Sequence, residues 1–519
     1  MSPKRAPGST RSAGSAGSAG SAGSAGSAGS AGKRAAAGPR VGQTVGRFEV
    51  EKAWLVDPVL GREGPGEIVV ADGILESVVW LKGAEAAGLD DKGVVVAPGF
   101  FDLHAHFREP GFEDAETIAS GSAAAAHGGY TSVALMPNTS PALDEPGVIE
   151  RIRAAVRAGG SPVEILAFGA VSAGRAGEQL SAMGELADAG VLGFSDDGAP
   201  VRTPKLLRSA LLYAGMFGLP VVDHAEDLEL SEGAEAHEGY VASILGLAGW
   251  PVAGEVNAVS RDLAVLEDVL RDEPRARLHL THVSTSAALD LVRRAKAAGL
   301  PVTCDVTPHH LALADEWIAG ARRWSWEALG ADGTSRDPWA DGVLVATPYD
   351  TALRVNPPLR TPADAAACLA ALLDGTADAV ATDHAPHTVV DKEVEFGRAS
   401  NGISGMETAL GVLLAMVDAD RLPLARAIAA LTAGPAGIVA RWPGVAATPV
   451  ARPRGLTEGA PADLVVFDRA DRWRVTPETL RSKGKNSPLL GRELSGRVLL
   501  TIAGGRLAYE DPEAASTEG

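Results

Sequence analysis

Short apolar runs alternate with Ala/Leu-rich stretches through the middle of this 519-residue chain, between about Pro98 and Arg441. Alternation of this kind predicts strand–helix–strand units and a parallel sheet. The apolar runs end near His106, Met136, Gly169, Ser195, His224, His282, Val306 and Asp383. Eight strand–helix units favour an α/β fold of the (β/α)8, TIM-type barrel class. In such a barrel the active site lies at the carboxyl ends of the strands.

Shorter strand-like runs flank this middle region on both sides. They are Phe48–Val56, Ile68–Ala71, Ile74–Trp80, Asp463–Phe467 and Val498–Ile502. We predict that the two sets pair into one small β domain, which would bring the two ends of the chain together.

The first 40 residues have a different composition. Seven Ser-Ala-Gly triplets run from Ser12 to Gly32, and such a segment cannot bury a core, so we expect a flexible coil. All of its charged residues are basic: Lys4, Arg5, Arg11, Lys33, Arg34 and Arg40. We favour a solvated, dispensable extension over an arm that docks on an acidic partner.

Composition excludes several classes of function. The net charge of −19 argues against nucleic acid and anionic membranes as partners. No apolar run has the length of a membrane span, and the start of the chain lacks the apolar stretch of a secretory signal. Cys304 and Cys368 form neither a disulfide framework nor a Cys-x-x-Cys metal site. These features predict a cytoplasmic protein that acts on a small molecule.

Two histidines, His104 and His106, lie in the segment from Pro98 to Gly111, after the apolar run Val94–Ala97. Residues two apart on a strand point to one face, so both imidazoles could reach one metal ion. Arg108 follows and supplies a fixed cation. By itself, a His-x-His motif fits two polar residues on an exposed strand equally well. The apolar lead-in argues against exposure and favours a hydrolytic centre that recognises an anion.

Four further strand ends carry residues of the metal-binding type. They are Asp197, His224, His282 and Asp383. Asp197, His282 and Asp383 share the alternation parity of apolar or small residues in their own strands, which would turn them toward the barrel axis. His279 has the opposite parity to His282, and we interpret it as structural.

Six candidate ligands therefore converge, counting His104 and His106. Imidazole and carboxylate without thiolate suit Zn²⁺ or another borderline divalent ion. Six ligands exceed the usual three of one catalytic zinc and fit two metals bridged by a carboxylate. We predict one or two Zn²⁺ per chain, with two favoured. The alternative, satisfied polar residues in a core, is less consistent with six of them at strand ends.

The chain resembles dihydroorotases of the class I branch of the metal-dependent amidohydrolase superfamily, over about residues 48 to 510. The resemblance rests on eight motifs. They span Asp102–Gly111, Met136–Thr139, Gly193–Gly198, Thr281–Thr285, Val306–Leu311, Asn356–Arg360, Thr382–His387 and Ser482–Pro488. It implies a (β/α)8 barrel with a β-sandwich built from both chain ends. The expected boundaries are a tail at 1–45, β-sandwich parts at 46–97 and 442–519, and a catalytic barrel at 98–441.

The resemblance also implies a role for each site residue. His104, His106 and Asp383 would hold the first metal, His224 and His282 the second, and Asp197 would bridge them. Many relatives bridge with a carboxylated lysine, but no lysine lies between Gly190 and Gly198, so the chain resembles the branch that uses aspartate. Asp197 is favoured over Asp196. The implied substrate contacts are His106, Arg108, Asn138, Asn356, His387, Asn401 and Gly402.

The implied reaction is the reversible cyclisation of N-carbamoyl-L-aspartate to (S)-dihydroorotate plus water, in de novo pyrimidine biosynthesis. A metal-activated water is expected to attack the cyclic amide carbonyl in the hydrolytic direction. Asp383 would be the general base and then the general acid. Arg108 would hold the substrate carboxylate through two parallel hydrogen bonds. A homo-oligomer and an association with aspartate transcarbamoylase are further expectations.

Two alternatives stay open. Allantoinases and hydantoinases share this fold and its metals, although Arg108 together with Met136–Thr139 favours a dihydroorotase. Some dihydroorotase-like chains are non-catalytic subunits of aspartate transcarbamoylase complexes, but those have lost metal ligands that this chain keeps. The 312–355 segment is longer than in relatives. We favour a surface loop with its own apolar cluster over a lid or a subunit contact.

Removal of residues 1–40 is expected to leave folding and turnover nearly unchanged, because the Ser-Ala-Gly repeats cannot pack against a core. Soluble yield and kcat of the truncated and full-length proteins measure this directly. A large loss of either quantity would show that the tail has a structural or docking role.

Overall fold

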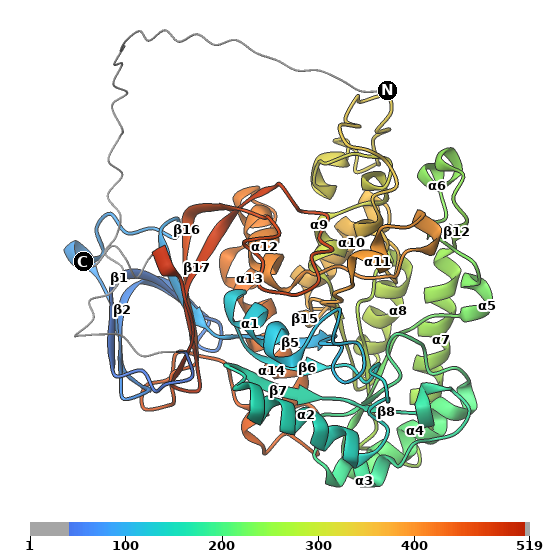
Figure 1. Ribbon diagram of the computed structural model, residues 1–519, viewed down its shortest axis with the longest axis horizontal. Coiled ribbons are helices and arrows are strands. Elements are labelled where there is room, and N and C mark those ends of the chain that lie inside the picture. Colours follow the sequence, from blue (N-terminus) through green and yellow to red (C-terminus); the bar gives the residue numbers. More distant parts are fainter. Residues whose placement is uncertain (1–40, 514–519) are drawn as a thin grey trace, which may run out of the picture.

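The computed structural model describes residues 41–513 (Figure 1). The Ser-Ala-Gly repeats and the last six residues lie outside this range. The predicted tail boundary at residue 45 comes too late. The amide of Gly42 donates to the Leu507 carbonyl, and the amide of Val45 donates to the Gly505 carbonyl. Val45 is also buried. Residues 41–45 therefore belong to the folded β region.

Strands from both chain ends form one seven-stranded sheet. Its order is β18 (Arg506–Glu510), β17 (Glu493–Ala503), β16 (Leu464–Arg474), β4 (Val94–Pro98), β1 (Arg47–Asp57), β2 (Arg62–Ala71) and β3 (Ile74–Trp80). Strand β4 joins the halves, because it pairs with β1 in parallel and with β16 in antiparallel orientation. Leu55, Val96 and Leu464 are buried together in this sheet's core. The chain ends thus pair as the strand pattern predicts.

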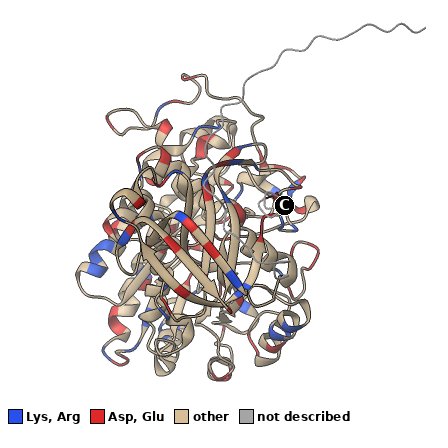
Figure 2. Ribbon diagram, turned by 90° about the vertical axis from the view of Figure 1, so that its left-hand side faces the viewer, with Lys and Arg blue, Asp and Glu red and all other residues tan. Residues whose placement is uncertain are grey.

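The surface of this sheet carries both signs of charge. Figure 2 shows acidic and basic residues interspersed over the side of the molecule where the sheet lies. Arg47 pairs with Glu49 and Glu76, and Arg497 pairs with Asp471. Within residues 41–513, none of the helices combines the length and the apolarity that a membrane crossing needs.

All strands of a second group are parallel. One sheet contains β5 (Phe100–Ala105), β6 (Tyr130–Leu135) and β7 (Glu164–Ala167). The other contains β8 (Gly169–Ala170), β9 (Phe194–Ser195), β10 (Pro220–Asp223), β13 (Arg277–Leu280), β14 (Val302–Val306) and β15 (Ala379–Val380). These strands lie where the apolar runs predicted them.

The apolar run ahead of the histidines belongs to the seven-stranded sheet. The apolar run Val94–Ala97 does not continue into the strand that carries the histidines. It forms β4 of the first sheet, and β5 of the second begins after Gly99. A Cβ at position 99 would lie 2.3 Å from Thr131 Cγ2, so only glycine fits where the chain passes from one sheet to the other.

Helices follow most of the parallel strands. They are α1 (Ile118–His127), α2 (Pro146–Gly159), α3 (Met183–Asp188), α4 (Pro204–Phe217), α7 (Val252–Val269), α8 (Ser286–Ala297), α10 (Pro362–Asp374), α12 (Ala409–Asp418), α13 (Leu424–Leu431) and α14 (Ala433–Ala440). Helices α1, α4, α8 and α10 each begin at a threonine whose side chain accepts a hydrogen bond from the third helical amide. Such caps contribute about 1 kcal/mol each and fix where a helix starts.

The 312–355 segment follows α9 (Pro308–Ala312) and contains short 3-10 turns. It folds around Trp317 and Trp324, which are buried. The Arg492 guanidinium lies 3.7 Å from the centroid of the Trp324 ring. The tryptophans share a cluster with Val475 and Leu489 of the C-terminal region. The apolar cluster of this segment is therefore not its own, as expected, but is shared with the C-terminal region.

Candidate metal centre

Five parallel strands end at one cluster of polar side chains. His104 lies in β5 and His106 follows it, while the other candidate ligands follow β9, β10, β13 and β15. All six candidate ligands are less than a tenth exposed; they are His104, His106, Asp197, His224, His282 and Asp383. Carboxyl ends of parallel strands meet at one edge, so residues distant in sequence come together there.

His104, His106 and Asp383 form the first half of the cluster. The Nε2 atoms of His104 and His106 are 3.1 Å apart. Asp383 Oδ1 lies 3.0 Å from His106 Nε2 and 3.5 Å from His104 Nε2. Three ligand-type atoms therefore face one small volume and could hold one metal ion.

His224 and His282 form the second half. His224 Nδ1 lies 2.9 Å from His282 Nε2. Asp197 Oδ1 lies 3.5 Å from the first atom and 3.4 Å from the second. A second set of one carboxylate oxygen and two ring nitrogens thus surrounds a second small volume.

Asp197 joins the two halves. Its Oδ2 lies 3.1 Å from His104 Nε2, whereas its Oδ1 faces His224 and His282. The neighbouring Asp196 points elsewhere, because its Oδ1 accepts a hydrogen bond from the Ser172 amide. Of the two aspartates, Asp197 is the one whose oxygens face both sets of histidines.

The outer nitrogens of three of these histidines each meet an oxygen. The contacts are His104 Nδ1 to Thr281 Oγ1 at 2.6 Å, His106 Nδ1 to Asn138 Oδ1 at 2.8 Å, and His224 Nε2 to Glu226 Oε2 at 3.1 Å. An acceptor on the outer nitrogen keeps the proton there and leaves the inner nitrogen with a free lone pair. The three lone pairs then point into the cluster, which is how metal-binding histidines are oriented.

The donor set fits a divalent cation. Asp197 Oδ1 and His282 Nδ1 are buried without a hydrogen-bond partner among the described residues. Burial lowers the pKa of His104, but the Asp197 carboxylate outweighs this and raises it to about 9. Burial also lowers the pKa of His224, which hydrogen bonds to Asp197 and Glu226 raise to about 10. The carboxylates thus create a strongly negative potential, and neutral nitrogen and oxygen-anion ligands suit Zn²⁺.

Three site residues have an unusual backbone conformation. Arg108, His282 and Asp383 have φ angles of +61°, +41° and +47°. Non-glycine residues rarely adopt positive φ, and such strain concentrates at functional sites. Extended geometry therefore stops before His282 and Asp383. Strand alternation predicted that His282 and Asp383 point toward the cluster. The turn at each of these residues, and not alternation alone, determines where the side chain points.

Arg108 lies beside the first half of the cluster. Its Nε donates to the Pro386 carbonyl at 3.1 Å, and a terminal nitrogen lies 3.2 Å from His387 Nε2. Burial lowers the pKa of Arg108 to about 10. Arg108 forms no ion pair with any residue in the described part of the chain. A partly buried guanidinium without a carboxylate partner is suited to bind an anion.

The loop after β15 brings three other predicted substrate contacts to Arg108. His387 Nε2 lies 2.7 Å from the Asn401 carbonyl, so it carries the proton in that contact. Gly402 has a φ of +144°, and a Cβ there would lie 2.6 Å from Ala385 Cβ. His387, Asn401 and Gly402 therefore form one packed surface next to the guanidinium.

Asn138 and Asn356 have partners inside the site. Asn138 faces His106 through Oδ1, and Asn356 Nδ2 donates to Glu226 Oε2 at 3.0 Å. Each asparagine thus contacts a candidate metal ligand or a residue that holds one. The structure brings all the predicted substrate contacts to the same side of the parallel strands.

Two residues that the sequence argument gave no role have clear positions here. Glu226 accepts hydrogen bonds from His224, Asn356 and Ser231. The only feature of the sequence that could have pointed to Glu226 is its position two residues after His224. Asn486 accepts a hydrogen bond from the His387 amide at 2.9 Å and donates to the Gly402 carbonyl at 2.9 Å. Asn486 lies in one of the quoted motifs, but its contacts are long-range and leave no local pattern.

Two other histidines lie near the centre. His279 contacts Thr303 Oγ1 and Asp305 Oδ2, both at 2.8 Å, which agrees with its interpretation as structural. His309 is buried, and its Nε2 has no hydrogen-bond partner within residues 41–513. Burial lowers the pKa of His309 to about 4, so it is neutral. No sequence feature separated His309 from an ordinary core histidine.

Comparison with known proteins gives one family. A family model described as dihydro-orotase-like matches residues 93–286. A dihydroorotase of Anaeromyxobacter dehalogenans (strain 2CP-1) is 43% identical over 467 residues, which cover 90% of this chain and 98% of that protein. A dihydroorotase of Pelotomaculum thermopropionicum is 41% identical and covers 88% of this chain and 97% of its own length.

Solved structures share the fold at low identity. The L-hydantoinase (dihydropyrimidinase) of Arthrobacter aurescens has a TM-score of 0.67 and is 23% identical, covering 88% of this chain and 94% of its own. The dihydropyrimidinase of Brevibacillus agri has a TM-score of 0.66 at 18% identity, covering 89% and 95%. These are amidohydrolases with mixed α/β structure of the TIM-barrel type.

Gly484→Ala is expected to raise KM for the substrate by roughly tenfold or more, because small displacements of positioning groups are costly. The new Cβ would lie 2.6 Å from Pro386 Cβ and 2.8 Å from the His387 amide nitrogen. Gly437→Ala is the matched control, since nothing lies within 4 Å of its added Cβ. Steady-state kinetics test this, and equal KM values for both variants would contradict it.

Proposed function

This chain belongs to the dihydroorotase family of amidohydrolases, and on that premise we propose that its buried centre interconverts N-carbamoyl-L-aspartate and (S)-dihydroorotate. The enzyme is a hydrolase of a cyclic amide C–N bond. In the biosynthetic direction the reaction closes the ring and releases water, which is a step of pyrimidine synthesis.

The observation that carries the substrate assignment is the partly buried guanidinium of Arg108, which has no ion pair within residues 41–513 and lies beside the histidine–carboxylate cluster. Dihydroorotate carries a carboxylate on the ring carbon that lies two bonds from the scissile carbonyl carbon. That carboxylate would accept two parallel hydrogen bonds from Arg108 and neutralise it. The same contact fixes the distance from the ring carbonyl to the cluster, because His106 and Arg108 lie two residues apart.

The candidate ligands support a centre with two Zn²⁺. His104, His106 and Asp383 would hold one ion, His224 and His282 the other, and Asp197 would bridge them. A zinc ion lowers the pKa of bound water and polarises a carbonyl. The outer contacts of His104, His106 and His224 keep their inner lone pairs available for this role.

Asp383 is proposed to move the proton. Its Oδ1 faces the two histidines of β5, and no hydrogen bond engages its Oδ2 within the described chain. Burial raises the pKa of Asp383, but the neighbouring histidines outweigh this and hold it well below the usual range, so the group starts as a base. Oδ2 can accept a proton from the attacking water and deliver it to the leaving ring nitrogen.

The remaining contacts orient the ring. His387 can donate to a ring substituent once its contact to Asn401 is exchanged for the substrate. Gly402 keeps the loop close to Ala385 and His387, because a side chain there would collide with Ala385. Asn138 contacts His106, and Asn356 contacts Glu226. The amide groups of both asparagines lie at the edge of the site where the substrate would bind.

The parallel strands are proposed to close into one (β/α)8 barrel at 98–441. Parallel bridging of Ala105 with His384 supports this closure, as do bonds from the Phe168 amide to the Leu135 carbonyl and from the Leu192 amide to the Ala167 carbonyl. The first of these connects β5 with the segment after β15, the second extends the pairing of β6 with β7, and the third connects β7 with the segment just before β9 of the other sheet. The seven-stranded sheet at 46–97 and 442–519 is proposed to be the β-sandwich of this family.

The two alternatives to a dihydroorotase are another cyclic amidohydrolase and a non-catalytic subunit. The hydantoinases that share the fold are 18–23% identical, and this identity says nothing of substrate. A non-catalytic subunit is disfavoured, because all six candidate ligands converge. A homo-oligomer and an association with aspartate transcarbamoylase stay predictions.

Asp197→Ala is expected to lower the zinc content of the purified protein, since it removes the only carboxylate that faces both halves of the cluster within residues 41–513. Asp196→Asn is the matched control, because that side chain points to Ser172 and should leave the metal content unchanged. Elemental analysis of both variants decides the matter. An Asp197→Ala protein with the parental zinc content would show that the bridge is assigned to the wrong residue.

Asp383→Asn tests the proton transfer separately from binding. The amide keeps the shape and one oxygen but cannot carry the proton, so kcat should fall by roughly 10²-fold or more. Zinc content is measured in the same samples. A kcat near the parental value with zinc bound would rule out the proton-transfer role.

Arg108→Leu tests the substrate. The parent should prefer dihydroorotate over dihydrouracil and allantoin by roughly 10³-fold or more in kcat/KM, because the uncharged rings leave the guanidinium partly buried and unpaired. The variant should lose most of this preference, mainly because its kcat/KM for dihydroorotate falls. Arg398→Leu, which removes an exposed arginine from the segment after β15, is the control. Equal turnover of the three compounds by the parent would leave a general cyclic amidase.

A further inference from the structure

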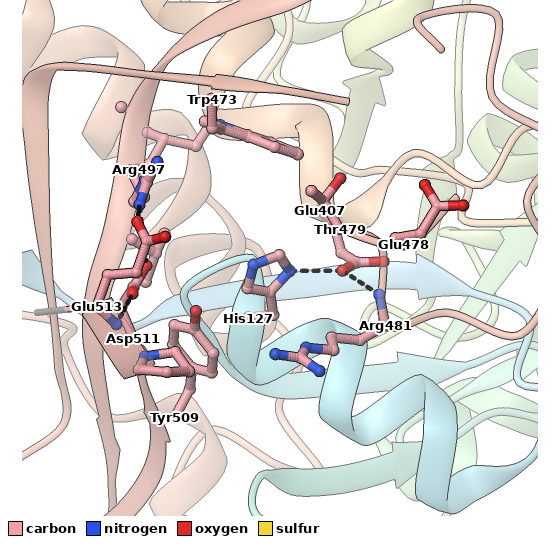
Figure 3. Close-up of a pocket in the computed structure, with 14 residues that line it drawn as sticks. His127, Glu407, Trp473, Glu478, Thr479, Arg481, Arg497, Tyr509, Asp511 and Glu513 are labelled. Atoms are coloured by element: carbon pink, nitrogen blue, oxygen red, sulfur yellow. Dashed lines mark hydrogen bonds and ion pairs between the residues drawn. The ribbon is translucent and has the colours of Figure 1, made fainter. Parts of the chain in front are cut away.

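A second cavity lies apart from the metal centre, where the seven-stranded sheet meets helix α1 (Figure 3). Its volume is about 350 Å³, within the range of small-molecule sites. The lining comes from α1, from the 3-10 turn Met406–Thr408, from strands β16 to β18, and from the loop between β16 and β17. The function proposed above uses none of these residues.

Three aromatic rings form one wall of the cavity. The His127 ring lies 4.9 Å from the Tyr509 ring and 6.1 Å from the Trp473 ring, measured between centroids, and both pairs are edge-to-face. Figure 3 shows Trp473 and Tyr509 on opposite sides of His127. A flat ring placed against this wall would contact apolar faces and displace water.

Most charges around the cavity are already paired. Glu407 accepts hydrogen bonds from the His127 ring and from the amides of Arg481 and Ser482. Arg497 pairs with Asp471, Asp511 and Glu513. These groups cannot recognise a ligand without losing their present partners.

Two polar groups at the cavity, on Arg481 and Tyr509, lack such partners within the described range. The Arg481 guanidinium forms no ion pair, and the Tyr509 hydroxyl no hydrogen bond, with any residue in the described range. Burial raises the pKa of Tyr509 and the Arg481 charge lowers it, so the two groups act on each other. Figure 3 shows the Arg481 side chain directed toward Tyr509 below His127. The Arg481 guanidinium, which has no ion pair within the described range, and the Tyr509 hydroxyl therefore face the same part of the cavity.

We propose that this cavity is an effector site for a small planar carboxylate, an aromatic or heteroaromatic monocarboxylic acid. The ring would lie against Trp473 and His127. Its carboxylate would accept two hydrogen bonds from Arg481 and one from the Tyr509 hydroxyl. A phosphorylated ligand is disfavoured, because Glu407, Glu478, Asp511 and Glu513 line the same cavity.

The site has a direct connection to the substrate loop. Glu407 holds the amides of Arg481 and Ser482, and Ser482 Oγ donates to Glu116 Oε2 at 2.6 Å. Two residues further, Gly484 packs on Pro386 and His387, and Asn486 then binds the His387 amide. A ligand that pulls on Arg481 would thus act on the segment that positions His387. This effect on turnover rests on the function proposed above, whereas binding does not.

Binding is tested by calorimetry on the full-length protein with benzoate, and with benzamide as its uncharged counterpart. Benzoate should bind at least about tenfold more tightly than benzamide, and Arg481→Gln should weaken benzoate by a similar factor. Tyr509→Phe should weaken it by about threefold. Arg108→Leu, at the metal centre, should leave benzoate binding unchanged. No saturable binding, equal binding of benzamide, or binding that Arg108→Leu removes and Arg481→Gln keeps would overturn the site.

The connection is tested by the KM for dihydroorotate, measured with and without saturating benzoate. A change in KM that disappears in Arg481→Gln supports the connection. A change that is equal in the parent and in Arg481→Gln would place benzoate at the metal centre and overturn it. If the protein turns over no dihydroorotate, the proposed function fails while the calorimetric result on the cavity still stands.

Discussion

The structure depends on one electrostatic constraint: two carboxylates and the lone pairs of several imidazoles share a volume that is closed to water. Asp197 faces His104 with one oxygen and His224 with the other, at 3.1 and 3.5 Å, where the lone pairs of oxygen and nitrogen repel unless a cation or a proton lies between them. Only a bound cation or extra protons can balance this arrangement. Thr281, Asn138 and Glu226 hold it in place by fixing the outer nitrogens of three histidines. The parallel strands deliver these side chains, and capped helices determine where each strand ends.

The same constraint explains why much of the site could be predicted from sequence. Side chains that must reach one point have to stand at strand ends with a common direction, and the period of a strand makes that visible. Asp197 could be preferred over Asp196 because it shares the parity of Ser195, and Asp196 indeed turns to Ser172. The parallel strands also lie at the apolar runs, since buried strands need continuous apolar sequence.

The rest could not be predicted, because it depends on contacts between distant residues. Glu226 meets Asn356 across 130 positions, and Asn486 meets His387 across 99. No periodicity records such pairs. The apolar run Val94–Ala97 shows another limit, since a buried strand has the same composition in either sheet. Only Gly99 marks the change of sheet, through a contact with Thr131 that sequence does not show. The place of Gly42 in the β region rests likewise on pairing with Leu507.

The placement of β4 has a consequence for the order in which the protein can be assembled. This strand meets β1 at only two positions and obtains most of its pairing from β16, which is made after the whole parallel-strand region. A ribosome must therefore release the chain through β16 before β4 has both neighbours. Because a single residue separates β4 from β5, the strand that carries His104 stays attached to an unfinished sheet until then. The candidate metal centre is consequently tied, through β5, to a sheet that is completed only when β16 has been made.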